Sequence, residues 1–222
     1  KPNDTLTFKG EEDELSNFHP CNMVWNRTDM HCSEQAYGFE MAVGNSRLDM
    51  ASEILKASRA REVKAHMKKI YKHEDWEKKN VEVMKKVCRA KVDQVERVKD
   101  KLLGSDDKQI AECVIGDQFW SCGLSKEAAE NTDPAHWPGE NMLGKIWMEI
   151  REELREEIKK DKDFKTVNSK SKKQTAKNGT GAKSTSGTPL PKKRNLSDGT
   201  PGNATQKPKP NGQTPPKNGG KK

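Results

Sequence analysis

The sequence predicts a mainly helical α+β domain with a few short strands over residues 1–160, followed by a disordered basic tail over residues 161–222. Before residue 160, apolar side chains recur at helical spacing in several segments, whereas runs typical of strands are few and short. Only 31% of the whole chain is hydrophobic, which is low for a wholly globular protein. One part of the chain is therefore expected to fold and the other is not.

The tail is identified by a change of composition at about Lys165, after which Lys, Ser, Thr, Gly, Asn, Gln and Pro make up almost the whole chain. Such a segment cannot bury enough apolar surface to offset its loss of conformational entropy. It carries about 14 Lys and Arg against one acid, and leaves about 28 bases against about 33 acids before it. The tail is compatible with a solubilising role or with weak, salt-dependent nucleic-acid binding, and the run 191–194 is compatible with a nuclear-import signal.

The five cysteines are scattered, odd in number, and form no Cys-x-x-Cys pair. This pattern argues against a disulfide framework and a structural zinc site, and favours an intracellular, reducing compartment, cytoplasmic or nuclear. The histidines show no metal-ligand spacing, so we expect no metal and no cofactor. No membrane partner is expected, because no apolar run reaches the length of a membrane span. The first residue is Lys1 rather than Met, which is compatible with a piece of a longer protein.

Local patterns predict the elements of the folded part. Ser33 is expected to cap a helix that carries Glu34 in its first turn and ends at Gly44-Asn45. A loop fits residues 15–20, which Asn and Pro interrupt. Short strands are predicted at 5–8, 23–25 and 110–115, and further helices at 48–58, 60–67, from 75 onward, over 91–103, and from Asn141 to the end of the domain.

Two helical stripes are assigned to the core. The helix from residue 75 places Trp76, Val83, Met84, Val87 and Cys88 on one face. The last helix has an equally clear apolar face, made of Leu143, Ile146, Trp147, Ile150, Leu154 and Ile158.

Three segments contain unusual residues where a hydrophobic core would not need them: 15–18 (LSNF), 32–37 (CSEQAY), and 117–124 (DQFWSCGL) followed by 137–144 (WPGENMLG). In this order and at these separations they resemble the NADAR family, whose members show a Ser-Asn-Phe element, a Ser-Glu-(His or Gln)-Ala-Tyr helix start, a Trp-Gly-x-Gly loop and a closing Asn-x-Leu-Gly. The resemblance covers residues of about 6–154 and omits the tail.

This resemblance implies a compact YbiA-like fold and an N-glycosidase activity. The family is known for removing ADP-ribose from guanine bases and for hydrolysing a ribosylamino-pyrimidine intermediate of riboflavin synthesis. The sequence departs from the family at Ser121, which replaces a common glycine, and at Cys122, where bacterial members often have an acid. Met41 stands where many members carry a lysine suspected of forming a Schiff base with the opened sugar.

The candidate acids also have a chemical basis that does not depend on the family. Breaking a bond between ribose and nitrogen develops positive charge at the anomeric carbon, so a carboxylate is needed there to stabilise the charge or to activate water. Glu34 and Asp117 are the catalytic candidates. At a helix start, Glu34 would keep a lowered pKa unless buried, which suits an ionised stabiliser or base. The alternatives are a simple helix-capping acid at Glu34 and a turn residue at Asp117.

A second set of residues is expected to bind the substrate. Trp120 lies between turn-forming residues, where its ring could stack on a flat base, whereas Phe119 is assigned to the core. Asn141 is expected to cap the last helix, whose exposed amides would suit a phosphate. The full substrate-binding set comprises Asn17, Phe18, Tyr37, Trp120, Gly123, Asn141 and Gly144.

Three functions remain open from the sequence. The first is an N-glycosidase that acts on an ADP-ribosylated guanine or a related nucleotide, free or in nucleic acid. The second is a binding module that keeps the pocket without turnover, suggested by the departures at Met41, Ser121 and Cys122. The third is a nucleic-acid accessory domain of a larger polypeptide that binds through the tail.

Overall fold

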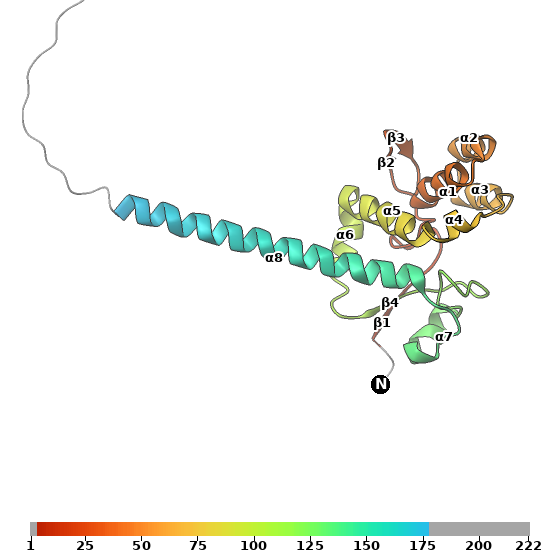
Figure 1. Ribbon diagram of the computed structural model, residues 1–222. Coiled ribbons are helices and arrows are strands. Elements are labelled where there is room, and N and C mark those ends of the chain that lie inside the picture. Colours follow the sequence, from red (N-terminus) through yellow and green to blue (C-terminus); the bar gives the residue numbers. More distant parts are fainter. Residues whose placement is uncertain (1–3, 178–222) are drawn as a thin grey trace, which may run out of the picture. The chain divides into compact units, whose positions relative to one another are not determined.

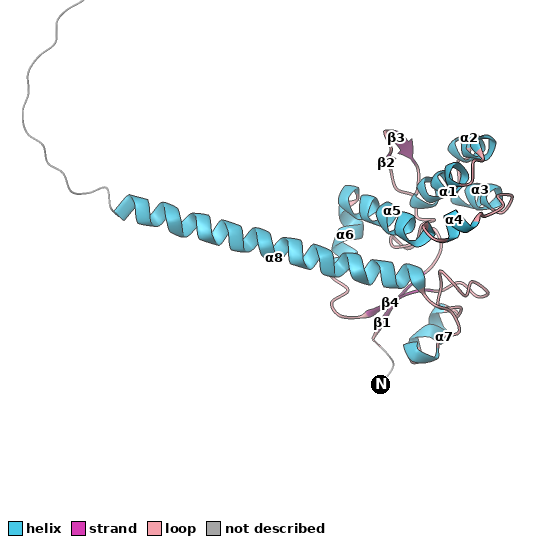
Figure 2. Cartoon of the chain, viewed as in Figure 1, coloured by secondary structure: helices cyan, strands magenta, loops and turns pink. Residues whose placement is uncertain are grey.

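The computed structural model describes residues 4–177, with side chains as far as Thr166, and is a mainly helical α+β domain, as predicted (Figure 2). Its elements are β1 (Thr5–Phe8), β2 (Met23–Trp25), β3 (Thr28–Met30), α1 (Ser33–Gly44), α2 (Leu48–Lys56), α3 (Ala60–Met67), α4 (Glu74–Glu77), α5 (Asn80–Gln94), α6 (Glu96–Leu103), β4 (Gln109–Glu112), α7 (Lys126–Glu130), the 3-10 turn η1 (Pro134–His136) and α8 (Met142–Lys177). No helix in this range is long and apolar enough to cross a bilayer.

The helices pack around α1 and α5. Helix α1 contacts α2, α3 and α5, while α5 also contacts α6 and α8 (Figure 1). Helix α8 contacts β4, α5 and α6, and buries Leu143, Ile146, Trp147 and Ile150, all at most 2% exposed, which confirms the apolar face predicted for it.

The two small sheets have different roles. Strands β2 and β3 form an antiparallel hairpin, whereas β1 and β4 are parallel neighbours with Phe8 opposite Glu112. Parallel strands end at the same edge. The pairing therefore brings the residues that follow Phe8 close to those that follow Glu112, although about 100 residues separate them in the chain.

The predicted helices from residue 75 and over 91–103 are wrong in their boundaries. The chain forms three helices instead, and Val95 between α5 and α6 has extended backbone angles (φ −123°, ψ 92°). The side chain of Gln94 accepts from the backbone amide of Val24 in β2 (2.7 Å) and donates to the carbonyl of the same residue (3.0 Å), which fixes the end of α5. The bend lets α6 bury Val98 and Leu102.

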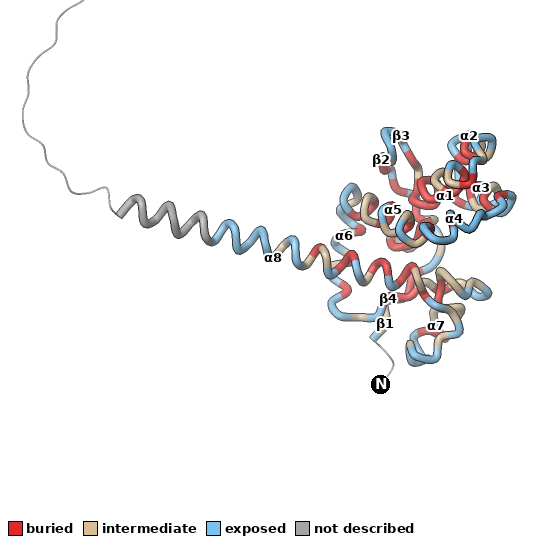
Figure 3. The backbone as a smooth tube through the Cα atoms, viewed as in Figure 1, coloured by how far each residue is buried: buried red, intermediate tan, exposed pale blue. Residues whose placement is uncertain are grey.

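The predicted domain boundary at 160 does not coincide with the end of an element, because α8 continues to Lys177. No Gly or Pro interrupts residues 142–177 after Gly144, and an i,i+4 ion pair joins Lys160 to Glu156. From about residue 159 to Thr166 the helix is exposed (Figure 3). The rest of the predicted tail, with the basic run 191–194, lies outside the described residues.

Asn141 joins the start of α8 to β4. Its Nδ2 donates to the carbonyl of Ile110 (2.8 Å) and its Oδ1 accepts from the amide of Glu112 (3.1 Å). The helix begins after Asn141 as predicted, yet the expected capping side chain is instead bound to the strand. A Cβ at Gly144 would collide with the Ile110 carbonyl and with Asn141, so only glycine permits this close approach.

We therefore expect Asn141→Ala to lower the free energy of unfolding by about 2–4 kcal/mol, because a buried carbonyl and a partly buried amide of β4 lose their partners. Urea unfolding followed by circular dichroism measures this change. The matched control is Asn131→Ala, which removes an exposed bond to Glu127 and should cost less than about 1 kcal/mol. Equal losses in both variants would contradict the assigned role.

Candidate functional site

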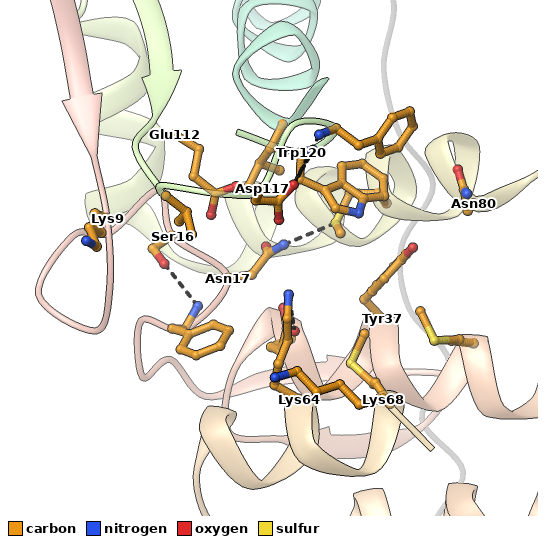
Figure 4. A pocket seen from close by; sticks show the side chains of 18 of the residues that line it. Lys9, Ser16, Asn17, Tyr37, Lys64, Lys68, Asn80, Glu112, Asp117 and Trp120 are labelled. Atoms are coloured by element: carbon orange, nitrogen blue, oxygen red, sulfur yellow. Dashed lines mark hydrogen bonds and ion pairs between the residues drawn. The ribbon is translucent and has the colours of Figure 1, made fainter. Parts of the chain in front are cut away.

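A cavity of about 650 Å³ opens where the ends of β1 and β4 meet α1, α3 and α5 (Figure 4). Its size is within the range of pockets that bind small ligands. The lining contains acids, lysines, amides and aromatic rings: Lys9, Ser16, Asn17, Phe18, Glu34, Tyr37, Met41, Lys64, Met67, Lys68, Lys72, Glu77, Asn80, Met84, Glu112, Val114, Asp117, Phe119, Trp120, Leu143 and Gly10. Six of the predicted site residues are among them.

Glu34 is buried at the first turn of α1, with 4% of its surface exposed. Its Oε1 has no hydrogen-bond partner, and the Nζ of Lys64 lies 3.8 Å away. Burial raises the pKa of Glu34, the charge of Lys64 lowers it, and the charge of Asp117 raises it. A lowered pKa was expected for Glu34 unless it is buried, and the structure shows the buried case, in which loss of hydration raises the pKa.

The start of α1 also differs from the prediction in its cap. Cys32, not Ser33, is the N-cap residue, and no side chain caps the helix. The hydroxyl of Ser33 instead donates to Oδ1 of Asn17 (2.9 Å), while the amide of Glu34 donates to the Asn17 carbonyl (3.0 Å). The loop that carries Asn17 is therefore fixed to the helix that carries Glu34.

Asp117 is both a turn residue and a pocket residue. Its Oδ1 accepts from the amides of Phe119 (3.2 Å) and Trp120 (2.9 Å), which orients the carboxylate. Gly116 before it has a φ of +86°, which favours glycine. The two readings of Asp117 left open by the sequence are thus compatible.

Two further acids line the pocket, Glu77 and Glu112 at the end of β4, and both were missed by the sequence analysis. Burial, reinforced by the charges of Glu34 and Asp117, raises the pKa of Glu112 to about 8. Figure 4 shows Glu112 and Asp117 entering the pocket from the same side, near Asn17. The position of Glu112 in the strand could have identified it. Glu112 is two residues after Ile110, so its side chain lies on the same face of β4 as that buried residue.

Lysines form the cationic part of the pocket. Lys9 follows β1, whereas Lys64, Lys68 and Lys72 come from α3 and the segment after it. Lys64 and Lys68 are four residues apart, a spacing that places two side chains on one face of a helix. Met41, which replaces the lysine suggested by the resemblance, lines the same pocket and is 3% exposed.

Buried side chains donate hydrogen bonds to the backbone of the loop over 15–18. The Nζ of Lys91, which is fully buried, donates to the Ser16 carbonyl (2.7 Å), and Nε1 of Trp147 donates to the Leu15 carbonyl (2.9 Å). Nδ2 of Asn17 lies 3.1 Å from the sulfur of Met84. Asn17 is thus presented to the pocket in a fixed orientation.

Aromatic side chains form one wall. The ring of Tyr37 meets the ring of Trp120 edge to face, with centroids 5.7 Å apart, and Trp120 meets Phe119 in the same way at 4.9 Å. Trp120 lines the pocket as the stacking hypothesis requires. Phe119, which was assigned to the core, also lines the pocket and is only partly buried.

Gly123, Asn141 and Gly144 do not line this pocket, contrary to expectation. They support it from outside, because Gly123 packs against Pro138 and Gly139 while the other two join α8 to β4.

Ser121 and Cys122, two of the departures from the family pattern, are fully buried behind the lining. The Ser121 hydroxyl donates to the Glu112 carbonyl (2.8 Å). Among the departures from the family pattern, only Met41 changes the pocket itself.

Residues 4–166 contain no group of three or more His, Cys, Asp or Glu side chains arranged to hold a metal ion.

Residues 7–155 match the sequence profile of the NADAR domain. This chain belongs to the NADAR family. The matched range contains all the acids and all the aromatic residues of the pocket, so the geometry described above is that of a NADAR domain.

Three curated proteins resemble this NADAR domain. Protein irg-1 of Caenorhabditis elegans is 29% identical over 138 residues, covering 60% of this chain and 65% of that protein. N-glycosidase R617 of Acanthamoeba polyphaga mimivirus is 36% identical over 78 residues, covering 35% and 46%. Riboflavin biosynthesis protein VVA0006 of Vibrio vulnificus (strain YJ016) is 30% identical over 146 residues, covering 64% and 35%. The chain therefore spans less than two-thirds of the length of each relative.

The fold is similar to that of the E. coli protein YbiA, solved by NMR, with a TM-score of 0.57 at 23% identity. The similarity covers 70% of this chain and 88% of YbiA. This likeness confirms the YbiA-like fold. At the level of the family, a glycosidase-like hydrolase function is supported by the NADAR profile and by the N-glycosidase relative.

Proposed function

We propose that this NADAR domain hydrolyses the N-glycosidic bond of an ADP-ribosylated guanine or of a related ribosylamine or nucleotide. The observation that carries the proposal is the meeting of Glu34, Glu112 and Asp117 in one pocket beside the Tyr37–Trp120 wall. Carboxyl groups held in different environments can divide the roles of acid and base between them.

The roles follow from the environment of each carboxyl group. With a pKa of about 8, Glu112 is largely protonated at neutral pH and can give a proton to the departing nitrogen. Burial raises the pKa of Glu34, and the ammonium of Lys64 at 3.8 Å acts in the opposite direction. In its ionised form Glu34 takes a proton from water or stabilises the charge on the sugar. The water oxygen bonds to the anomeric carbon as the carbon–nitrogen bond breaks, so atoms and protons balance. Asp117 adds negative charge from an oriented position.

The remaining lining supports a nucleotide-like ligand. The lysines at 9, 64, 68 and 72 provide positive charge for phosphate groups, while Trp120 and Phe119 offer flat surfaces for a base. Acidic and basic parts of one cavity thus match a ligand with a phosphate at one end and an N-glycosidic bond at the other.

Incubation of the purified chain with ADP-ribosylated guanosine and a panel of related ribosides, followed by mass spectrometry of the products, tests this proposal. Release of a free base together with the matching sugar or sugar phosphate is expected for at least one member of the panel. Absence of release from every member would contradict it.

A second candidate is a binding module without turnover, favoured by the single observation that Met41 occupies the pocket in place of a lysine. Titration calorimetry with ADP-ribose separates the two functions. Binding without any product release would support the module, whereas release of a base would exclude it.

A further inference from the structure

A second cavity, of about 410 Å³, adjoins the first at Phe18, whose side chain lines both. Its walls come from three places: the start of α3 with Ser58, Arg59 and Ala60, Arg97 of α6, and the chain that enters and leaves the β2–β3 hairpin. No role was assigned to this cavity from the sequence.

The cavity is cationic. Arg59 and Arg97 are exposed, and no carboxylate of residues 4–166 lies within ion-pair distance of either guanidinium. One Nη of Arg97 donates to the Pro20 carbonyl (3.1 Å), which fixes the side chain and leaves other N–H groups available. Glu11 is the one acid of the lining, and Arg61 lies 3.5 Å from it.

The lining also contains a ring nitrogen without a partner. Nε2 of His31, another lining residue, is buried without a hydrogen-bond partner. The start of α3 is already occupied, because Glu62 in its first turn accepts from the amide (2.9 Å) and the hydroxyl (3.3 Å) of Ser58. The anion site therefore depends on the two guanidinium groups and the imidazole, which suit an anion with several oxygen atoms.

We propose that this cavity binds a phosphoryl group of the same ligand whose riboside occupies the first pocket, with Phe18 between the two parts. The identity of the riboside part depends on the proposed function, whereas the phosphoryl site depends on Arg59 and Arg97. The phosphoryl group has two sources: a phosphate of a free nucleotide-like ligand, or the backbone phosphate of a nucleic-acid strand that carries the modified base.

The test compares the full chain with the double variant Arg59→Gln/Arg97→Gln. The control is Arg27→Gln, an exposed arginine that lines neither cavity. The probes are fluorescent ADP-ribose and a fluorescent single-stranded DNA hexanucleotide, and anisotropy is measured at several salt concentrations. Because binding requires no turnover, failure of the proposed hydrolysis leaves this result interpretable.

We expect the double variant to bind at least one probe about 10-fold more weakly. For DNA, the slope of log affinity against log salt concentration should decrease by the amount that corresponds to about two phosphate contacts. Loss of ADP-ribose binding identifies the phosphate of the free ligand, and loss of DNA binding alone identifies the strand. The pair Arg59→Lys/Arg97→Lys should recover part of the affinity. Unchanged affinities, an equal loss in Arg27→Gln, or no binding of either probe by the unmodified chain would overturn the proposal.

Discussion

Glu34→Gln is expected to lower turnover by about 100-fold or more, which is the usual effect of losing one well-placed electrostatic group at a reaction centre. Charge develops on the sugar only as the bond to nitrogen breaks, so the carboxylate matters more to the transition state than to ligand binding. Affinity for ADP-ribose should therefore change little. Folding should also survive, because the replacement is isosteric and removes a buried carboxyl with an unpartnered oxygen.

Steady-state kinetics and calorimetry on the same preparation separate these effects. The matched control is Glu82→Gln, another acid in the first turn of a helix, which is exposed and pairs with Lys86 (2.6 Å). It should have the turnover of the unmodified chain. A Glu34→Gln protein with full turnover would remove this residue from the mechanism and move the role to Asp117.

Glu112→Gln is expected to lower turnover by about 10²–10⁴-fold, the range found for loss of a general acid. In the unmodified chain, activity should fall as the pH rises through about 8, because Glu112 then loses the proton that it gives to the leaving base. The residual activity of the variant should lack this alkaline decline. A decline that persists unchanged in the variant would assign it to another group.

The same substitution has an opposite effect on stability. The pKa of Glu112 rises from 4.5 to about 8 on folding, so the folded state holds the proton more tightly. Stability from this group is full below the lower value, decreases as the pH rises between the two values, and is constant above the higher one. The effect of Glu112→Gln on the free energy of unfolding, relative to the unmodified chain, should therefore be more favourable at about pH 9 than at about pH 5, by about 1–3 kcal/mol.

Urea unfolding at these two pH values measures the difference. Glu96→Gln, an exposed acid at the start of α6, provides the control and should show no such pH-dependent gain. A variant of Glu112 that is equally destabilised at both pH values would mean that the carboxyl is not buried as described.

Local signals in the sequence predicted much of the fold. The pattern of α8, the break at Gly44-Asn45 and the short strands β1 and β4 depend on neighbouring residues, which a single sequence displays. The bend at Val95 was missed because its cause is a contact from Gln94 to a distant hairpin. Long-range contacts of this kind leave no periodic signal.

The candidate site was predictable only in part, for a similar reason. Glu34 and Trp120 were found through motifs, since each stands among residues that a core does not require. Glu112 was read as part of a strand, and its role depends on the parallel pairing of β4 with β1. Conversely, Asn141 and Gly144 belong to a motif but serve the contact between helix and strand, because motifs record packing constraints as well as chemistry.

The most direct test of hydrolysis at this site is a single-turnover reaction in ¹⁸O-labelled water with the riboside that the panel selects, followed by mass spectrometry of the sugar product. The mechanism predicts one ¹⁸O atom at the anomeric position of the product from the unmodified chain, released together with the intact base. It also predicts at least about 100-fold slower appearance of that product with Glu34→Gln. A sugar product without the label, or equal rates from both proteins, would contradict the account.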